Sequence, residues 1–403
     1  MIIIGGGAAG LCAAITAARA GKKITILEQN SRIGKKILVS GNGKCNIGNR
    51  HITPHRFHSQ NPDFVQQCLQ TYDAQSIYSF FRSIGLELTE GKEGKLFPLS
   101  FHASSVAELL EYEAKRRGVE IVYECKVNTL AKEGESFVLE TSQGVKRCKN
   151  LLIACGSPAA PKLGGNDSGY AFASKLGHSL VPRHPSLVQL VSEEDWLKQC
   201  AGVKISGIAK LYANGEYVTE KEGDILFTNY GISGLAILDI SREVSLRLAQ
   251  FDYCELSLDL MPAFSKEKLT NLFLSHIDKG SQKPVSLWLQ GFIHKKLVPV
   301  ILEHAHIKSR MEDQLHRKEI NTLVHTIKHL RLSIRDTKGF QGAEVSTGGI
   351  DTTEIEPNTM ASKLVKGLYF AGEILDVDGD RGGFNFHFAW VSGMRAGRAM
   401  RDA

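Results

Sequence analysis

The eight cysteines of this 403-residue chain include no C-x-x-C pair and no spacing typical of metal ligands. Their pattern favours free thiols in a reducing compartment over a disulfide framework. No segment approaches the roughly 18 apolar residues that span a bilayer. The first residues carry no basic stretch ahead of their apolar segment, so we expect a strand there and not a signal peptide. These absences predict a cytoplasmic protein with no membrane partner.

Internal repeats and low-complexity tracts are also absent, and 42% hydrophobic with 23% charged residues describes a globular protein. A chain of this length exceeds what one core usually organises, so two or three units are expected. The net charge of +6 is uneven: residues 19–56 hold nine Lys/Arg against one acid, and residues 291–338 hold ten against five. These segments are either solvated surfaces or attract phosphates of a cofactor, a nicotinamide dinucleotide or RNA.

A dinucleotide fingerprint opens the chain. An apolar strand over residues 2–4 leads into Gly5-x-Gly7-x-x-Gly10, which begins an Ala-rich helix, and a second strand ends at Glu28. The three glycines permit a tight turn, the approach of a pyrophosphate and close helix packing. The helix N-terminus favours the negative pyrophosphate, and the carboxylate can accept hydrogen bonds from ribose hydroxyls.

The rest of the chain predicts an interrupted α/β domain. Residues 63–85 and 103–118 have helical periodicity, and strands are expected at 120–123, 137–141 and 151–156. Short alternating runs over 187–260 then predict antiparallel strands, and helical periodicity follows over 265–332. Strand and glycine-turn patterns return at 345–350 and 367–373.

We therefore predict a Rossmann-type, glutathione-reductase-like FAD-binding domain built from residues 1–188 and 338–403. Its insertion would consist of a β-rich, antiparallel or barrel-like part over 189–262 and a helical part over 263–337.

The C-terminal glycines distinguish FAD from a nicotinamide cofactor. A second strand-then-glycine segment ends at Glu373, and Gly382-Gly383 then opens a helix. Such an arrangement holds the ribitol and ring of a flavin, with Glu373 as the ribitol or phosphate-edge ligand. The amides of residues 383–385 would face the pyrimidine end of the ring, where a helix N-terminus stabilises the anionic reduced form.

Long motifs resemble those of the BaiN/RdsA flavoprotein family, also called YhiN-like. They are GKKILVSGNGKCN from Gly34, TGGI from Thr347, TMASK from Thr359, GLYFAGEILDVDG from Gly367 and GGFNF from Gly382, with GISG from Gly231 in the insertion. The resemblance covers essentially the whole chain. It departs from the family pattern at Asn42, Lys44, Leu235 and Ala361, and at Lys44 the bidentate fork of the family's arginine is lost.

The candidate cofactor contacts come from the fingerprint, the flavin segments and this resemblance. They are Gly5, Gly7, Ala9, Gly10, Glu28, Gln29, Lys35, Lys36, Ser40, Gly41, Gly43, Asn46, Val127, Ala154, Gly156, Gly372, Glu373, Asp376, Gly382, Gly383, Phe384, Asn385 and Phe386.

The segment from Lys35 to Asn46 is expected to be a loop that passes beside the flavin. Its small residues would let the backbone approach the ring, and its lysines would bring positive charge to the pyrophosphate or a substrate. Cys45 is the candidate catalytic residue, as a proton donor or redox-sensitive thiol near flavin N5. The alternative is a small packed side chain. The reactivity of the thiol would depend on a lowered pKa.

No metal site is predicted. Asp376, Asp378 and Asp380 resemble a cation loop, but the EF-hand spacing is incomplete because no Glu occupies its twelfth position. His51, His55 and His58 could share a helical face, but Pro54 opposes a regular helix there. We expect these histidines in a loop or a substrate channel.

The resemblance implies a reductase of conjugated C=C bonds. Its two substrate types are uridine in large-subunit ribosomal RNA, giving dihydrouridine, and the enone of a steroid acid; amine oxidation is a third activity of related chains. Reduced FAD would deliver a hydride from N5 to the carbon β to a carbonyl, and a general acid would protonate the α carbon. Because the chain has no second GxGxxG, NAD(P)H would bind transiently.

Three hypotheses follow. The first is a ribosomal RNA dihydrouridine synthase whose basic insertion docks RNA. The second is a small-molecule ene-reductase or amine oxidase, and the third is an RNA-binding or assembly factor with a structural flavin. The sequence alone does not choose the substrate, the redox partner (NADH, NADPH or oxygen) or the oligomeric state.

Overall fold

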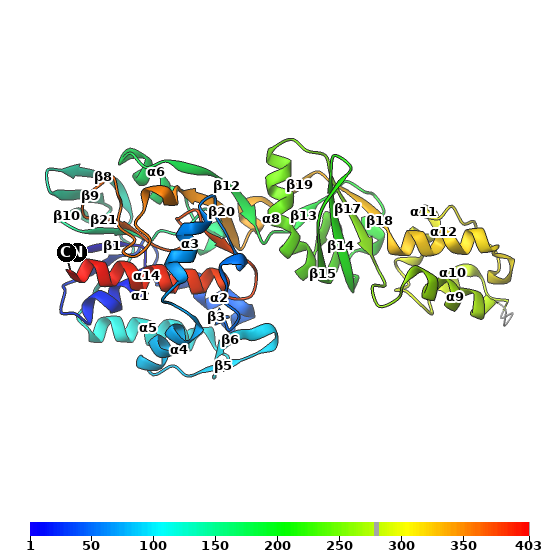
Figure 1. The fold of residues 1–403 in the computed structure, drawn as a ribbon, viewed down its shortest axis with the longest axis horizontal. Coiled ribbons are helices and arrows are strands. Elements are labelled where there is room, and N and C mark those ends of the chain that lie inside the picture. The colour runs from blue at the N-terminus through cyan, green and yellow to red at the C-terminus, as the bar shows by residue number, and fades with distance from the viewer. Residues whose placement is uncertain (278–281, 403) are drawn as a thin grey trace. The chain divides into compact units, whose positions relative to one another are not determined.

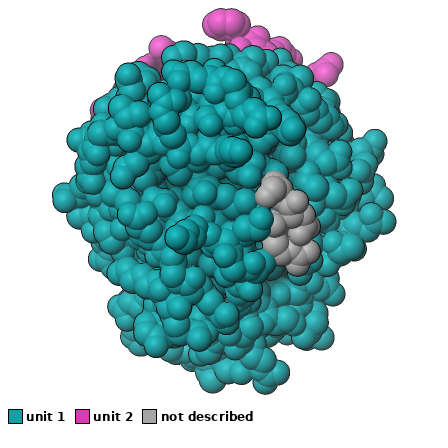
Figure 2. Space-filling view, turned by 90° about the vertical axis from the view of Figure 1, so that its left-hand side faces the viewer, with its two compact units in different colours: residues 1–183, 344–403 teal, residues 184–343 magenta. Residues whose placement is uncertain are grey.

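The structure, a computed structural model, describes residues 1–277 and 282–402. It divides into two compact units, residues 1–183 with 344–403, and residues 184–343. The boundaries proposed from the sequence lay at 188/189 and 337/338. Each unit has a hydrophobic core of its own. Most of the surface drawn in Figure 2 belongs to the first unit, coloured teal.

The first unit contains strands and helices from both of its chain segments. Its elements are β1 (Ile2–Ile4), α1 (Ala8–Ala18), β2 (Thr25–Leu27), α2 (Lys35–Gly43), β3 (Gly48–Asn49), β4 (Phe57–His58), α3 (Pro62–Leu69), α4 (Ala74–Ser83), β5 (Leu88–Glu90), β6 (Lys95–Pro98), α5 (Ala103–Arg116), β7 (Glu120–Val122), β8 (Val127–Glu133), β9 (Ser136–Thr141), β10 (Gly144–Cys148), β11 (Leu151–Ile153), α6 (Ser168–Lys175), β12 (Leu180–Ser186, which ends in the second unit), β20 (Val345–Ile350), β21 (Leu368–Phe370), β22 (Asp378–Gly379) and α14 (Phe384–Asp402).

A five-stranded parallel sheet in the order β21-β11-β1-β2-β7 forms the centre of this unit. The residues of β1 and β11 are buried, as expected for inner strands of a parallel sheet. Because β21 comes from the C-terminal segment, both ends of the chain build one sheet. The predicted Rossmann-type α/β class is confirmed.

Helix α1 packs against α14 with unusually small side chains between them (Figure 1). A Cβ at Gly393 would lie 2.4 Å from the carbonyl oxygen of Ala9, and one at Gly397 would lie 2.5 Å from that of Ala13. The two glycines are one helical turn apart and therefore share a face of α14. This close approach explains why the Ala-rich α1 is buried along almost its whole length.

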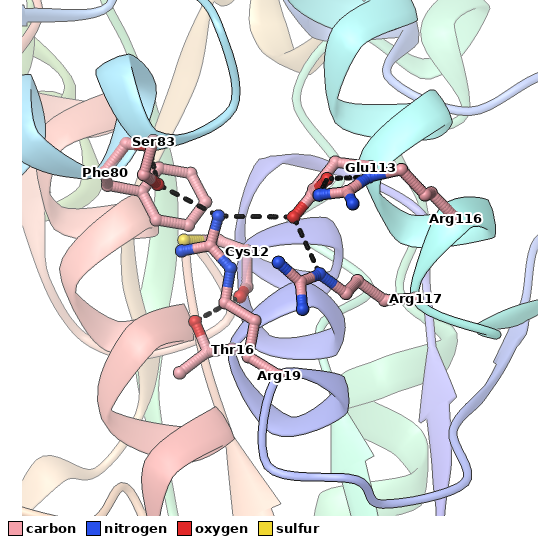
Figure 3. A network of polar contacts seen from close by, with 8 residues as sticks. All are labelled: Cys12, Thr16, Arg19, Phe80, Ser83, Glu113, Arg116 and Arg117. Carbon is pink, nitrogen blue, oxygen red and sulfur yellow. Dashed lines mark hydrogen bonds and ion pairs between the residues drawn. The ribbon is translucent and has the colours of Figure 1, made fainter.

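Buried Glu113 joins three elements around the outer end of α1 (Figure 3). It accepts hydrogen bonds from Arg116 on α5, from Arg117 directly after α5 and from Arg19 directly after α1. Arg19 also donates to Ser83 Oγ at the end of α4. The network pins the first helix of the fingerprint to its neighbours.

The second unit contains a seven-stranded antiparallel sheet and helices. Its elements are β13 (Leu190–Val191), α7 (Leu197–Cys200), β14 (Lys204–Ala213), β15 (Glu216–Thr228), β16 (Gly231–Ser233), α8 (Leu235–Ala249), β17 (Cys254–Asp259), α9 (Lys266–Ile277), α10 (Val285–Leu289), α11 (Val298–His304), α12 (Arg317–Lys328), β18 (Leu330–Ile334), β19 (Asp336–Thr337) and α13 (Gly339–Gly342).

The sheet of the second unit curls back on itself. Its strand order is β18-β17-β14-β15-β16-β13-β19, and every pairing between neighbours is antiparallel. The two outermost strands, β18 and β19, are separated in the chain by Arg335 alone. One residue cannot span an open sheet, so the two edges must meet at this point.

Several predicted elements differ from the structure. Residues 63–85 form two helices, because Asp73 caps a new helix with its side chain on Ser76 N. Residues 35–43 form α2 where a loop was expected, although its backbone leaves the helical conformation at residues 40–42. Helix α8 interrupts the β-rich part, and its buried positions recur every three or four residues. Strand β18 begins at Leu330, inside the stretch predicted to be helical.

No helix in the described ranges combines the length and apolar character that crossing a membrane requires.

Candidate functional site

The parallel strands deliver predicted site residues to one edge of the sheet. Gly5 follows β1, Glu28 follows β2, Ala154 follows β11, and Gly372 comes two residues after β21. Because these strands are parallel, their carboxyl ends lie along the same edge. Open α/β sheets bind their ligands in this position.

The glycine turn between β1 and α1 leaves room for a ligand at one position only. A Cβ at Gly5 would lie 2.4 Å from the carbonyl oxygen of Ala154, and one at Gly10 would lie 2.0 Å from that of Gly5. At Gly7, however, a Cβ would meet nothing within 4 Å. The first turn of α1 has no acidic residue and no side-chain cap, so its N–H groups face this open space ready for an anion.

Glu28 is buried and held by three hydrogen bonds. Its Oε2 accepts from Gly6 N at 2.8 Å, and its Oε1 accepts from the main-chain N and Nδ2 of Asn30 at 2.8 and 2.6 Å. Lys35 Nζ in turn donates to Asn30 Oδ1. The carboxylate predicted to bind a ribose is therefore fixed in orientation. Asn30 was missed because no motif spacing marks it.

Glu373 connects four segments of the first unit. Its Oε1 accepts hydrogen bonds from Ser157 Oγ at 2.6 Å and Ser346 N at 3.1 Å, and its Oε2 pairs with Lys36 Nζ at 2.8 Å. The pair is only partly exposed. Lys36 was predicted to bring charge to the pyrophosphate or a substrate, and the structure places that charge against Glu373.

The N-terminus of α14 is supported by the segment after α2. A Cβ at Gly383 would lie 2.3 Å from the carbonyl oxygen of Gly48, so the two backbones nearly touch. Asn49 Nδ2 donates to Gly382 O at 3.0 Å. The side chain of Asn385 is bonded to the N and O of Gly379, so it closes the preceding loop.

Asn46 carries an unpaired buried acceptor at this helix terminus. Its Oδ1 has no hydrogen-bond partner among the described residues and lies 2.8 Å from where a Cβ of Gly383 would be. A buried polar atom without a partner costs stability, so it is retained where a ligand can satisfy it.

Cys45 lies in this segment with a left-handed backbone, φ 57°, and a fully buried side chain. Burial raises the pKa of its thiol to about 12, although Ser40 opposes that shift. The thiol is therefore protonated at neutral pH and is not activated as a nucleophile. Its role as a proton donor stays a prediction.

The remaining candidate contacts have structural partners of their own. Gln29 Nε2 donates to Gly164 O, Ser40 Oγ to Ile37 O, and Asp376 Oδ2 accepts from Gln60 N at 2.8 Å. Ala9, Val127, Phe384 and Ala154 are buried, Phe386 stacks on Trp390, and Gly41, Gly43, Gly156 and Gly372 have positive φ.

Asp380 and His58, which belong to two separate sequence motifs, meet Arg56 in a charged cluster beside α14. Asp380 Oδ2 accepts from Arg56 Nε at 2.5 Å, and its Oδ1 lies 3.0 Å from His58 Nε2. The Arg56 guanidinium stacks 4.3 Å from the Phe384 ring centroid. Burial raises the pKa of Asp380, but the bonds from His58 and Arg56 outweigh burial and hold that pKa below its usual value. The pairing of β4 with β22 and the hydrogen bond from Asp380 N to Arg56 O bring these residues together.

The described residues include no group of three or more His, Cys, Asp or Glu side chains placed to hold a metal ion.

The site suits FAD in three respects. Open space lies at Gly7 before the α1 N-terminus, a fixed carboxylate ends β2, and Asn46 offers a buried acceptor where α14 begins. Pyrophosphate, ribose hydroxyls and the ring N–H of a flavin are groups that these features can bind.

Comparisons with known proteins agree with this geometry. The family model described as HI0933-like protein Rossmann domain matches residues 1–399. The chain belongs to this family. It is 36% identical over 403 residues to the 3-dehydro-bile acid delta(4,6)-reductase of Clostridium scindens, covering 99% of this chain and 98% of that one. It is 33% identical over 397 residues to the ribosomal RNA dihydrouridine synthase of Haemophilus influenzae, with 97% and 96% covered.

A solved structure shares the fold of this HI0933-like chain. The 3-ketosteroid delta1-dehydrogenase from Sterolibacterium denitrificans superposes with a TM-score of 0.54 at 10% identity, covering 100% of this chain and 99% of that chain. At so low an identity this likeness concerns the fold alone. Together, the family and its full-length relatives establish an oxidoreductase of the FAD-dependent type.

Proposed function

We propose that this protein reduces a conjugated C=C bond, and that its substrate is uridine in large-subunit ribosomal RNA. The observation that carries the proposal is full-length similarity to two enzymes whose names both denote hydrogen addition to such a bond. Bound FAD would supply the hydride, and NAD(P)H would be the transient reductant because the chain has one GxGxxG only. A ribosomal substrate would also place the enzyme in the cytoplasm.

The protein's own groups would bind and orient the cofactor. Gly7 and the α1 N-terminus would receive the pyrophosphate, and Glu28 would accept bonds from the ribose. Asn46 and the amides at Gly383 would receive the pyrimidine edge of the flavin ring. Three hydrogen bonds fix the orientation of Glu28 beforehand, which reduces the cost of binding.

We propose His58 as the proton donor. A proton must reach the α carbon when a C=C bond is reduced. Cys45 is fully buried, and burial lowers the pKa of buried His387 to about 4, so that imidazole stays neutral. His58 is partly exposed, and its Nε2–H donates to the Asp380 carboxylate. Nδ1 is then the atom that takes up and releases the proton.

RNA docking would use exposed basic residues of the second unit. Lys295, Arg317 and Lys318 are exposed and have no ion-pair partner within the described part of the chain. Such charges attract phosphates without regard to sequence.

A small-molecule substrate is the second candidate, and the bile acid reductase relative favours it. Both substrates contain a C=C bond conjugated to a carbonyl, so the same hydride and proton chemistry serves either.

The decisive experiment maps dihydrouridine by mass spectrometry in ribosomal RNA from a strain that lacks this protein. We expect one position to lose its modification and to regain it when the gene is restored. Purified enzyme is assayed in parallel with NADPH and either the RNA or a 3-oxo-Δ4 steroid acid. Unchanged RNA with steroid reduction would select the second candidate. RNA binding without reduction of either would indicate an assembly factor with a structural flavin.

The proton donor is tested with His58→Gln, because glutamine keeps an N–H for Asp380 but cannot transfer a proton. We expect C=C reduction to fall by about 10²–10⁴-fold. Flavin content and flavin reduction by NADPH should stay normal. His55→Asn, in the same segment, is the matched control. Normal turnover in His58→Gln would show that the cluster only pins the loop.

A further inference from the structure

Two aromatic rings, of exposed Phe101 and half-buried Phe97, lie beside the segment that follows α2. The Phe101 ring centroid lies 5.7 Å from that of Phe97, with the ring planes tilted by 35°. Lys44 Nζ lies 5.9 Å from the Phe101 centroid. Lys44 is exposed and has no ion-pair partner in residues 1–277 and 282–402. We call Phe97, Phe101 and Lys44 the aromatic platform.

The conformation of Phe101 gains little from packing. Its φ of 53° is in the left-handed region, which is strained for a bulky residue. Its side chain is still 44% exposed, so burial does not offset the strain. Outliers of this kind gather at functional sites.

The aromatic platform is joined to the cofactor site through Gly41. A Cβ at Gly41 would lie 3.5 Å from the Phe97 ring and 3.0 Å from Asn46 N. Asn46, two residues after Lys44, has its free acceptor at the N-terminus of α14. The platform therefore borders the site at which we place the flavin ring.

We propose that the aromatic platform stacks an unpaired base of single-stranded RNA next to the target nucleotide, with Lys44 against a phosphate. The inference rests on the proposed function and names a surface for its substrate. Aromatic rings beside a cation are the usual means of binding single strands, because every base has a π-face and every linkage a charge.

The experiment measures the affinity of FAD-loaded protein for a labelled oligouridine at several salt concentrations. Phe101→Asn removes the ring, and asparagine tolerates the left-handed backbone. We expect about 5- to 150-fold weaker binding with an unchanged salt slope, because stacking involves no counterions. Lys44→Gln should weaken binding less and lower the slope of log Kd against log salt by about 0.7. Tyr112→Asn and Lys175→Gln, at exposed positions elsewhere in the first unit, are matched controls.

Each outcome decides the proposal. Wild-type affinity in Phe101→Asn with normal flavin content would overturn it, as would wild-type protein that does not bind the oligomer. A Phe101→Asn variant that loses affinity for a 3-oxo-Δ4 steroid acid and not for RNA would assign the platform to a steroid. RNA binding that depends on Phe101, without dihydrouridine formed by the wild type, would uphold the platform and remove the proposed reaction.

Discussion

The two units use their charged residues in different ways. In the first unit, Glu28 and Glu373 gather hydrogen bonds from several segments at one edge of the sheet. In the second unit, four basic residues of the segment 291–338 form ion pairs within the unit. These are Arg310–Glu319, Lys328–Asp259, Arg331–Glu255 and Arg335–Glu193.

This difference teaches that a local excess of charge in a sequence is not the charge offered to a partner. Lys328 and Lys318 belong to the same helix, α12, yet one is buried against Asp259 and the other is exposed. Lys328 also donates hydrogen bonds to the carbonyls of Met261 and Phe264, so it stabilises the turn between these two residues. Only the exposed residues of the segment can attract RNA.

The largest effect is expected when the buried lysine of α12 is changed, and the exposed lysine of the same helix is its comparison. Lys328→Ala leaves the carboxylate of Asp259 buried without its partner, which should lower the free energy of unfolding by about 3–5 kcal/mol. Lys318→Ala should change it by less than about 0.5 kcal/mol, because that side chain is exposed. Urea unfolding of both variants is the measurement. Equal losses would contradict the distinction between internal and available charge.

Glu28 tests the site of the first unit. Glu28→Ala removes a charged hydrogen-bond acceptor from the ribose, so FAD affinity should fall by roughly 10- to 150-fold. Flavin released from the purified variant and its affinity on titration are measured. Glu108→Ala, an exposed glutamate of α5, should keep its flavin. Stoichiometric flavin in Glu28→Ala would remove this residue from the cofactor site.

The stabilisation that Glu113 contributes to the folded state should depend on pH. Burial raises the pKa of Glu113, but hydrogen bonds from Arg116 and Arg117 outweigh burial and hold that pKa below its ordinary 4.5. The folded state then binds the proton more weakly than the unfolded state, so the stabilisation is complete above this value and is lost as the pH falls through it. The Tm difference between wild type and Glu113→Gln should therefore narrow below about pH 4.5. A difference that is constant with pH would refute this assignment.

The smallest effect on folding is expected for the exposed basic residues of the second unit. Lys295, Arg317 and Lys318 are changed together to Glu, which should leave Tm and the flavin spectrum nearly unchanged because exposed charges contribute little. RNA affinity should fall for all sequences alike, and the salt slope should flatten. The same triple change to Gln separates lost attraction from added repulsion. Equal affinity and slope in both variants would exclude docking through these residues.

The sequence by itself determined the features that depend on neighbours in the chain. Gly5-x-Gly7-x-x-Gly10 between a strand and a helix, with Glu28 after the next strand, predicted the dinucleotide edge. The repeated strand-then-glycine pattern before Glu373 predicted a strand in the C-terminal segment, and β21 forms there as part of the parallel sheet. The strands and helix of these segments form as predicted because turn geometry and hydrophobic periodicity act over a few residues.

Tertiary structure decided every feature that depends on distant partners. Arg56 and Asp380 are more than 300 residues apart, and the pairing of β4 with β22 helps to bring them together beside α14. Residues 63–85 split into two helices because the side chain of Asp73 caps the second one, which is a local effect. Lys328 of α12 is buried because Asp259 at the end of β17 lies next to it, which is a long-range effect. The pKa of Cys45 is likewise set by burial among segments that the local sequence does not reveal. Hydrogen bonds and desolvation act over a few ångströms in space, so their strength is known only once the chain has folded.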